Sequence, residues 1–477
     1  MTKASLPAYD RKSLTPGIVH IGLGNFHRAH MAVYLDDLFA LGESHDWAII
    51  GAGVRAPDAK MRDALKGQDC LSTIIELDPK GKSARRIGAM IDFVPVDPTN
   101  APLIAAMTRP EIRIVSLTVT EGGYYINAAT GSFDPSHPDI AADGKTPGKP
   151  TTAFGAIVAA LKARKAAGIP PFTVMSCDNL PGNGHVTEAA VIGTARLSDP
   201  AFADWIAANV AFPNGMVDRI TPATGPRERA MAASFGLADD PVPVTCEPFR
   251  QWVVEDNFPQ GRPALEKVGV TFTPHVHAYE MMKIRILNGG HATIAYPGGL
   301  MDIEYVHEAM ANPLISGFLN KVEREEVIPY VPPVPNTDIG EYFTLIHHRF
   351  SNPEVADTER RLCLDGSNRQ PKFIIPSLRD ALAAGGKIEG LSLVSALWCR
   401  YCAGTTDSGT HIEPNDPNWD VLHPLALKAK DTPDAWLGMK EIYGDLAGND
   451  AFRAAFGAAL NSLWTKGTKA TLQAYIS

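Results

Sequence analysis

The chain has 477 residues, of which 45% are hydrophobic and 20% are charged, and its formal net charge is -9. This composition is typical of a globular protein, and the length favours two domains. The acidic balance disfavours nucleic acid or an anionic membrane as the main partner, because both require a basic surface, so a small molecule is the expected ligand.

Targeting and cysteine patterns favour a cytoplasmic location without a membrane partner. Residues 1–17 lack the apolar core of a secretory signal, and no later stretch offers about 20 uninterrupted apolar residues. The six cysteines are sparse, which is typical of reduced thiols. Only Cys399 and Cys402 form a C-x-x-C motif, and we interpret them as packing residues of an apolar helix, since nothing completes a zinc site.

Strands and helices alternate in the first half of the chain. A short strand is predicted over 17–24, and a continuous helical pattern follows it up to a glycine. A second strand over 47–54 completes a strand-helix-strand unit. Further strands are predicted over 112–120 and 171–179, with a helix over 156–168 between them. This alternation predicts an α/β fold, with a parallel sheet covered by helices on both faces.

The texture changes near residue 276, beyond which the sequence is mostly helical in period. We therefore expect an α/β domain over 1–275 and a mainly α-helical domain over 276–477. The proline-rich segment 328–338 is predicted to be a loop inside the second domain.

The stretch "GLGN" lies between the first predicted strand and helix, where a dinucleotide-binding fold has its glycine turn. Gly22 would allow the bend, and Gly24 would let the backbone approach the pyrophosphate. His27 replaces the third glycine of the fingerprint, so a purely structural turn is the alternative. Asp58 could accept hydrogen bonds from the ribose of NAD, or cap a helix. The adjacent Arg55 would suit NADP, and NAD is favoured.

The segment 279–299, "YEMMKIRILNGGHATIAYPGG", is predicted to be a helix on which Lys283, Asn288 and His291 fall within one half of the surface. Apolar neighbours would desolvate the lysine, lower its pKa and suit it to act as a base. A lysine that snorkels from a core helix is the alternative. The glycine pair at 289–290 weakens a helix, so we expect another part of the chain to approach the backbone there.

A polar cluster, "SCDNLPGNG", includes the end of the predicted strand 171–179, the edge at which parallel sheets bind ligands. Asn179 in this cluster and Asn288 could donate amide hydrogen bonds to one substrate oxygen as it gains charge. The alternative is ordinary turn chemistry, because Asp, Asn, Pro and Gly are turn formers.

Together these motifs resemble the mannitol dehydrogenase family, the polyol-specific long-chain dehydrogenases. The matching stretches span roughly residues 17–375 in the family's order. They are GIVHIGLGNFHRAH, SLTVTEGGYY, SCDNLPGNG, MVDRITPAT, KIRILNGGHA and DTERRLCLDGSNRQPKF. The resemblance implies a Rossmann-type NAD-binding domain and a helical substrate-binding domain, with the active site in the cleft between them. It also implies NAD-dependent, zinc-independent oxidation of a polyol to a ketose.

The resemblance also implies roles for individual residues. Lys283 would be the general acid/base, with Glu280 gating the exit of its proton. Asn179 and Asn288 would hold the reacting oxygen, and His291 would position the substrate. Further substrate contacts are implied at Asp218, Arg361 and Arg369. Cofactor contacts are implied at Gly22, Leu23, Gly24, Asn25, Phe26, Asp58, Thr120 and Glu121.

The activity we expect is the interconversion of D-mannitol and D-fructose by a monomer. D-arabinitol or sorbitol dehydrogenases and fructuronate or tagaturonate reductases are alternatives in the family, since some members differ at Leu364 and Arg369. Outside it, His27 and His30 could build a metal-dependent hydrolase or isomerase, or the chain could be a non-catalytic nucleotide sensor. We instead interpret both histidines as supporting the fold, and expect no metal ion.

Overall fold

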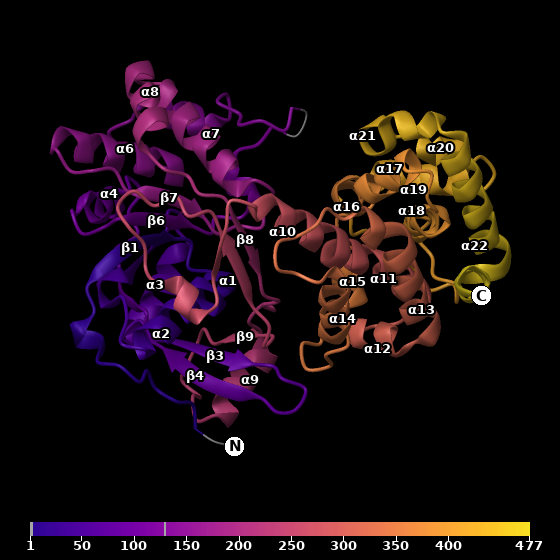
Figure 1. Ribbon diagram of the computed structural model, residues 1–477, viewed down its shortest axis with the longest axis horizontal. Coiled ribbons are helices and arrows are strands. Elements are labelled where there is room, and N and C mark those ends of the chain that lie inside the picture. Colours follow the sequence, from indigo (N-terminus) through magenta and orange to yellow (C-terminus); the bar gives the residue numbers. More distant parts are fainter. Residues whose placement is uncertain (1–2, 128–129) are drawn as a thin grey trace. The chain divides into compact units, whose positions relative to one another are not determined.

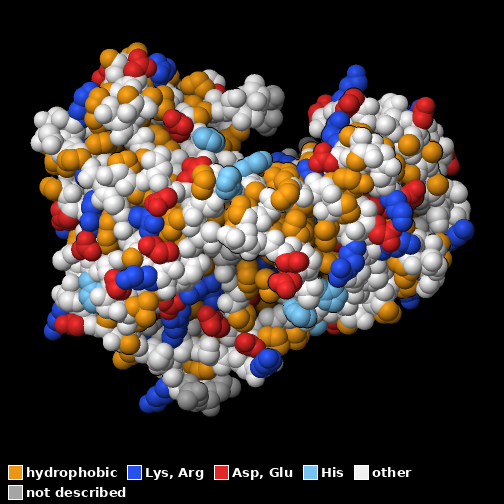
Figure 2. Space-filling model, in the orientation of Figure 1, with side chains coloured by type: hydrophobic (Ala, Val, Ile, Leu, Met, Phe, Trp, Pro, Cys, Tyr) orange, Lys and Arg blue, Asp and Glu red, His pale blue; other side chains and the backbone are white. Residues whose placement is uncertain are grey.

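The computed structural model, which describes residues 3–127 and 130–477, divides into two compact units (Figure 1). Unit 1 is Met1–His277 and unit 2 is Ala278–Ser477. No helix among the described residues is long and apolar enough to cross a membrane. On the face drawn in Figure 2, acidic and basic side chains are interspersed, in keeping with a small-molecule ligand.

Unit 1 is built on a five-stranded parallel sheet in the order β5-β2-β1-β6-β7. Its strands are β1 (Pro16–Ile21), β2 (Ala48–Ala52), β5 (Met90–Phe93), β6 (Ile114–Leu117) and β7 (Thr173–Ser176). The chain winds outward from β1 in one direction and then, from β6, in the other, which places the topological switch point of a Rossmann-type sheet between these two strands. The predicted α/β fold class is confirmed, as are the four predicted strands.

Two smaller sheets complete unit 1, and neither was predicted from the sequence. One has the order β11-β10-β8 and consists of β8 (Gly215–Asp218), β10 (Gln251–Val254) and β11 (Thr271–Phe272). The other has the order β4-β3-β9 and consists of β3 (Ser72–Glu76), β4 (Ser83–Ile87) and β9 (Val244–Cys246).

Helices cover both faces of the parallel sheet, as its continuous apolar strands require. The α-helices of unit 1 are α1 (Asn25–Ala29), α2 (Met31–Ala40), α3 (Asp58–Gly67), α4 (Ala101–Thr108), α5 (Pro138–Lys145), α6 (Ala153–Ala166), α7 (Asn183–Arg196), α8 (Pro200–Asn209) and α9 (Pro226–Ser234). Its 3-10 turns are η1 (Arg11–Ser13), η2 (His45–Trp47), η3 (Glu121–Tyr124) and η4 (Leu265–Val268). Because side chains alternate along a strand, Ile18 and Ile114 pack in the core that contains α2, while Val19 and Val115 pack in the core that contains α6.

The continuous helix predicted after the first strand is wrong, because α1 and α2 are separated at His30. The backbone of His30, with φ -120° and ψ -92°, is not helical. The break places the His30 ring edge-on against Trp252 at 5.5 Å, and its Nε2 donates a hydrogen bond to the carbonyl of Gln251 at 2.9 Å. A contact with a distant strand therefore overrides the local helical pattern.

The described residues of unit 2 form helices and no β-strand, as the sequence pattern predicts. The α-helices are α10 (Val276–Met282), α11 (Gly289–Leu300), α12 (Val306–Ala311), α13 (Pro313–Val322), α14 (Ile339–Phe350), α15 (Glu359–Leu362), α16 (Gly366–Phe373), α17 (Ile375–Ala383), α18 (Glu389–Cys402), α19 (Trp419–Ala429), α20 (Asp434–Leu437), α21 (Lys440–Tyr443) and α22 (Asp450–Ile476). Two π-helical segments, η5 (Lys283–Asn288) and η6 (Glu323–Val327), and two 3-10 turns, η7 (Ile328–Tyr330) and η8 (Gly444–Gly448), lie among them. Cys399 and Cys402 are buried on α18 as free thiols, so they are packing residues as interpreted.

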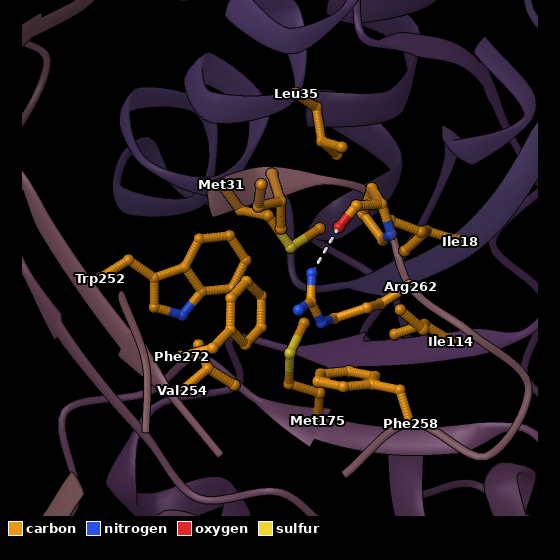
Figure 3. Close-up of a pocket in the computed structure, with 12 residues that line it drawn as sticks. Ile18, Met31, Leu35, Ile114, Met175, Trp252, Val254, Phe258, Arg262 and Phe272 are labelled. Atoms are coloured by element: carbon orange, nitrogen blue, oxygen red, sulfur yellow. Dashed lines mark hydrogen bonds between the residues drawn. The ribbon is translucent and has the colours of Figure 1, made fainter. Parts of the chain in front are cut away.

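An apolar pocket in unit 1 lies between the parallel sheet and α2 (Figure 3). Arg262 reaches into it, with its guanidinium carbon 3.4 Å from the ring centre of Phe272 and a hydrogen bond of 3.2 Å to the carbonyl of Pro263. The free volume is about 10 Å³, scarcely enough for one water molecule. This pocket is therefore a packing gap in the core and not a ligand site.

Candidate active site

The turn after β1 has the two properties that a pyrophosphate-binding turn needs. Gly22 has a φ of 102°, and a Cβ there would lie 2.1 Å from the carbonyl oxygen of Thr118, so only glycine fits. Its own carbonyl accepts a hydrogen bond of 2.5 Å from the Thr118 hydroxyl. Gly24 is exposed, with nothing within 4 Å of the place of a Cβ, so its backbone is open to a ligand. These residues fit a dinucleotide at the switch point of the sheet.

A buried histidine, His20, supports this turn through hydrogen bonds. His20 Nδ1 lies 2.7 Å from the Ser116 hydroxyl, and its Nε2 lies 3.1 Å from the Gly22 carbonyl and 2.9 Å from the Thr118 hydroxyl. Its ring stacks on His27 with 3.4 Å between ring centres. Burial lowers the pKa of His20 to about 3 and takes the pKa of His27 well below its usual value, so both rings are neutral near pH 7.

His27 and His30 therefore support the fold, as interpreted from the sequence. His27 packs under the glycine turn, and His30 joins α2 to β10. In the part of the chain that the structure describes, no group of three or more His, Cys, Asp or Glu residues could hold a metal ion.

Several other residues of the predicted cofactor set take part in packing. Asn25 Nδ2 donates a hydrogen bond of 2.9 Å to the Thr224 hydroxyl, which ties α1 to the loop after β8. The Phe26 ring stacks on His30 at 4.9 Å, and Leu23 is buried. The side chains of these residues shape the turn, and the exposed Gly24 backbone is its ligand-facing part.

The Asp58 side chain does not cap α3, so the capping role that the sequence offered as the alternative is not the one it plays. Its carboxylate accepts a hydrogen bond of 3.0 Å from the Arg55 backbone and pairs with the Arg55 guanidinium at 3.1 Å, which closes the turn before α3. A Cβ at Gly53 would lie 2.3 Å from the Asp58 Cβ, so Asp58 also packs against the end of β2. That is the place where an acidic residue meets the ribose of NAD in Rossmann-type folds.

The loops after β6 and β7 are joined by a carboxylate whose role the sequence did not reveal. Asp178 accepts hydrogen bonds from the backbone of Val119 at 2.9 Å and of Thr120 at 3.0 Å, and from the Tyr124 hydroxyl at 2.7 Å. Asp178 belongs to the polar cluster that was singled out, but its partners lie in another loop, which no local pattern identifies. The exposed residues of the site at this edge are Thr120, Glu121 and Asn179, and Asp218 is buried at the end of β8.

In unit 2, the predicted lysine segment is buried but is not a continuous α-helix. Lys283 and Glu280 are each only 5% exposed. The prediction of an α-helix is wrong over Lys283–Asn288, which is the π-helix η5. Because a π-helix joins residues i and i+5, the angular positions worked out at 100° per residue do not hold. Single π-helical turns inside helices occur frequently at functional sites.

Close packing explains the glycine pair that follows. A Cβ at Gly289 would lie 3.3 Å from the Phe373 carbonyl oxygen, and one at Gly290 would lie 3.3 Å from the Phe350 ring and 3.5 Å from Glu323 Oε1. The predicted close approach to the backbone is confirmed.

The charges of two of the predicted substrate contacts act on His291. Its ring stacks on Phe350 at 4.1 Å. Burial lowers the pKa of His291 to about 3, an effect that Asp357 opposes and that Arg361 and Arg369 reinforce. The charges of both arginines therefore act on the histidine, which is neutral near pH 7.

Arg361 is held by a partner that was not predicted. Its Nε donates to Asp357 Oδ1 at 2.5 Å, and its Nη2 donates to Asp357 Oδ2. The Arg361 side chain is 50% exposed, whereas Asp357 is 11% exposed, so the fork fixes one edge of the guanidinium and leaves the other accessible. The i,i+4 spacing of Asp and Arg in "DTERR" was the signal available in the sequence. Arg369 donates to the Leu362 carbonyl at 2.8 Å.

The candidate residues thus fall into two sets, one in each unit. Unit 1 carries the glycine turn and its neighbours, with Asn179 and Asp218. Unit 2 carries Glu280, Lys283, Asn288 and His291 on one helical segment, with Arg361 and Arg369 acting on that histidine.

Comparisons with known proteins agree with this division. Residues 16–267 match the family described as the mannitol dehydrogenase Rossmann domain, and residues 275–464 match the mannitol dehydrogenase C-terminal domain. The chain is 70% identical over 471 residues to a mannitol 2-dehydrogenase of Cereibacter sphaeroides, covering 99% of this chain and 98% of that protein. It is 42% identical to a mannitol 2-dehydrogenase of Phaeosphaeria nodorum, covering 100% of this chain and 84% of that protein.

Two solved structures are similar along their whole length. One is the Pseudomonas fluorescens mannitol 2-dehydrogenase in a ternary complex with NAD and D-mannitol, which is 43% identical with a TM-score of 0.87 over 100% of this chain and 97% of that one. The other is a D-sorbitol dehydrogenase in substrate-free form, which is 35% identical with a TM-score of 0.90 over 99% of this chain and 100% of that one. Since the matches cover both units, the chain belongs to the mannitol dehydrogenase family.

Proposed function

We propose that the protein is an NAD-dependent, metal-independent dehydrogenase that interconverts D-mannitol and D-fructose. The observation that carries the proposal is a buried lysine, Lys283, on the segment that also holds Glu280, Asn288 and His291. The 70% identity to a mannitol 2-dehydrogenase and the similarity to a structure that holds NAD and D-mannitol support the choice of substrate and cofactor.

NAD would bind at the carboxyl edge of the parallel sheet in unit 1. Gly22 makes the bend, the open backbone at Gly24 admits the pyrophosphate, and Asp58 at the end of β2 suits the ribose hydroxyls. Bound NAD supplies the hydride acceptor, and the protein supplies geometry and electrostatics.

In the proposed reaction, neutral Lys283 removes the proton from the hydroxyl at C2 of the polyol while a hydride leaves the same carbon. Lys283 is only 5% exposed, and burial in general disfavours the charged form of a lysine. Asn179 and Asn288 donate amide hydrogen bonds to the oxygen as it gains negative charge, and a ketone forms. Glu280 then takes the proton from Lys283 and releases it to solvent. In the reverse direction, the lysine ammonium protonates the oxygen as hydride returns to the carbon.

The remaining residues are proposed to bind the polyol chain. Neutral His291, held against Phe350, and the buried Asp218 suit hydrogen bonds to hydroxyl groups. The accessible edge of Arg361, together with Arg369, suits hydroxyl oxygens at the far end of the substrate.

The proposal is tested by following NADH absorbance with NAD and D-mannitol, D-arabinitol or D-sorbitol, each with and without EDTA. We expect the fastest reduction of NAD with D-mannitol, at a rate that EDTA does not change. Loss of activity with EDTA would overturn the metal-independent mechanism. Activity only in the reverse direction with fructuronate or tagaturonate would replace the polyol by a hexuronate, whose carboxylate would suit Arg361.

Lys283→Ala tests the role of the lysine. General acid/base groups contribute typically about 10²- to 10⁴-fold, so kcat should fall by at least about a hundredfold while NADH still binds. Lys372→Ala removes an exposed lysine of α16 and is the matched control, expected to stay within about twofold of the unmodified protein. Equal activity of Lys283→Ala and the control would refute the mechanism.

We also propose that the enzyme acts in the cytoplasm as a monomer. The six cysteines are free and buried, which suits a reducing compartment. The exposed large apolar side chains come mostly from separate elements, which is ordinary for a monomer surface. Light scattering of the purified protein tests the oligomeric state.

A further inference from the structure

Thr120 has a backbone conformation that threonine rarely adopts. Its φ of 65° and ψ of 168° lie in a region populated almost only by glycine, because the Cβ of other residues is crowded there. The residue is exposed, so burial of its own side chain does not impose this conformation. Strain of this kind persists only where the surrounding structure enforces it, and it is frequent at ligand-binding sites.

The carboxylate of Asp178 binds the backbone at this residue. Oδ1 accepts a hydrogen bond from the Thr120 backbone at 3.0 Å, while Oδ2 accepts from Val119 at 2.9 Å and from the Tyr124 hydroxyl at 2.7 Å. The Tyr124 hydroxyl also lies 2.6 Å from the Ser176 hydroxyl at the end of β7. Two consecutive backbone N–H groups are therefore directed toward one carboxylate. Burial raises the pKa of Asp178, and its hydrogen bonds with Tyr124, Val119 and Thr120 oppose that rise.

The clamped loop is also tied to the glycine turn. Thr118, two residues before Thr120, donates its hydroxyl to the Gly22 carbonyl at 2.5 Å, and its backbone N–H donates to Ile21 at 2.9 Å. The loop thus spans from the switch point between β1 and β6 to the end of β7. These are the strand ends at which a Rossmann-type sheet binds its dinucleotide.

We propose that Asp178 is a positioning residue, which holds the loop after β6 in its strained conformation so that the exposed residues Thr120 and Glu121 form part of the NAD-binding edge. This inference rests on the proposed function, since it assumes that NAD binds there. Without the carboxylate, Thr120 relaxes toward an ordinary conformation and this stretch of backbone moves.

A second carboxylate in unit 1 provides a matched control. Asp143 is buried and accepts hydrogen bonds from the backbone of Thr151 at 2.7 Å and of Thr152 at 3.0 Å. It therefore holds two consecutive N–H groups as Asp178 does. Neither threonine has a positive φ, so this clamp holds no strained residue.

The experiment measures the dissociation constant of NADH by fluorescence titration of the full-length protein. Asp178→Asn is expected to raise it at least about tenfold, because the amide cannot accept from both N–H groups, whereas Asp143→Asn raises it less than about threefold. A double-mutant cycle with Thr120→Gly isolates the strain. In the Thr120→Gly background, Asp178→Asn should raise the constant less than about threefold, since glycine adopts the conformation unaided.

The outcomes separate the two proposals. No binding of NADH by the unmodified protein refutes the proposed function itself. Normal binding by Asp178→Asn, an equal effect of Asp143→Asn, or an undiminished effect in the Thr120→Gly background refutes the positioning role alone. If Asp178→Asn does not fold, Tyr124→Phe removes one of the three donors. It should raise the constant by more than about threefold at unchanged helix content, and a smaller increase by this variant also refutes the role.

Discussion

His30 should make unit 1 sensitive to mild acid, because its ring is buried in the neutral form. The residue is fully buried, its Nε2 donates to the Gln251 carbonyl, and its Nδ1 has no hydrogen-bond partner among the described residues. Burial lowers the pKa of His30 from 6.5 to about 3, although the hydrogen bond to Gln251 opposes the change. The unfolded chain therefore takes up a proton on this residue at a higher pH than the folded protein does.

The sign and size of the effect follow from this difference. Since the folded pKa is the lower one, the free energy of unfolding is largest above pH 6.5 and falls as the pH drops from there toward 3. Between about pH 7.5 and pH 5, protonation of His30 in the unfolded chain lowers the free energy of unfolding by about 2 kcal/mol. His20, whose pKa is also lowered to about 3 by burial, adds a loss in the same direction.

His30→Gln isolates this contribution, because the glutamine amide can still donate to the Gln251 carbonyl but does not titrate. Urea unfolding followed by tryptophan fluorescence at about pH 7.5 and pH 5 gives the free energy of unfolding at each pH. Between about pH 7.5 and pH 5, the free energy of unfolding of the variant should fall by about 2 kcal/mol less than that of the unmodified protein. This gain is expected whatever the stability of the variant at the higher pH. His411→Gln, at an exposed position, is the control and should show no such gain. The reasoning fails if the stability of His30→Gln falls with pH as steeply as that of the unmodified protein.

Two further substitutions follow from the geometry of the sites. Gly22→Ala should lower the free energy of unfolding by more than about 2 kcal/mol and abolish NADH binding, because the new Cβ would meet the Thr118 carbonyl oxygen at 2.1 Å. Thermal unfolding and an NADH titration check this, and normal binding would contradict it. Asp357→Asn should raise the KM for D-mannitol about tenfold with little change in kcat or in NADH affinity, because Arg361 loses its fork. Steady-state kinetics check this prediction. Asp434→Asn is the control, because it breaks an exposed Asp–Arg fork of the same geometry. Equal KM values for the two variants would refute the reasoning.

Much of the fold could be predicted from local patterns. The β-branched runs mark β1, β2, β6 and β7, because a strand buried on both faces is apolar throughout. The small sheet β4-β3-β9 could not be predicted in this way, since β9 pairs with a strand that lies far earlier in the chain. Pairing of this kind depends on long-range contacts that no short window of sequence contains.

The features of the candidate site likewise divide into those that local patterns predict and those that depend on distant contacts. The glycine turn, the lysine segment and the polar cluster after β7 are recognisable in the sequence, because their chemistry needs those residue types at those places. The π-helical turn at η5 was not predicted, because a single widened turn is too short to be recognised from the periodicity of the sequence. This turn lies beside a glycine pair packed against α14 and α16. The partners of Asp178 and the role of His20 were likewise not predictable.

The sequence by itself therefore determined the α/β architecture, the family and the residues that carry the proposed chemistry, because periodicity and motifs are local properties of the chain. Only the tertiary structure decided the break at His30, the strained conformation of Thr120 and the carboxylate that holds it. Each of these depends on hydrogen bonds or packing between residues far apart in the sequence. Such contacts override local preference once the strands have brought those residues together.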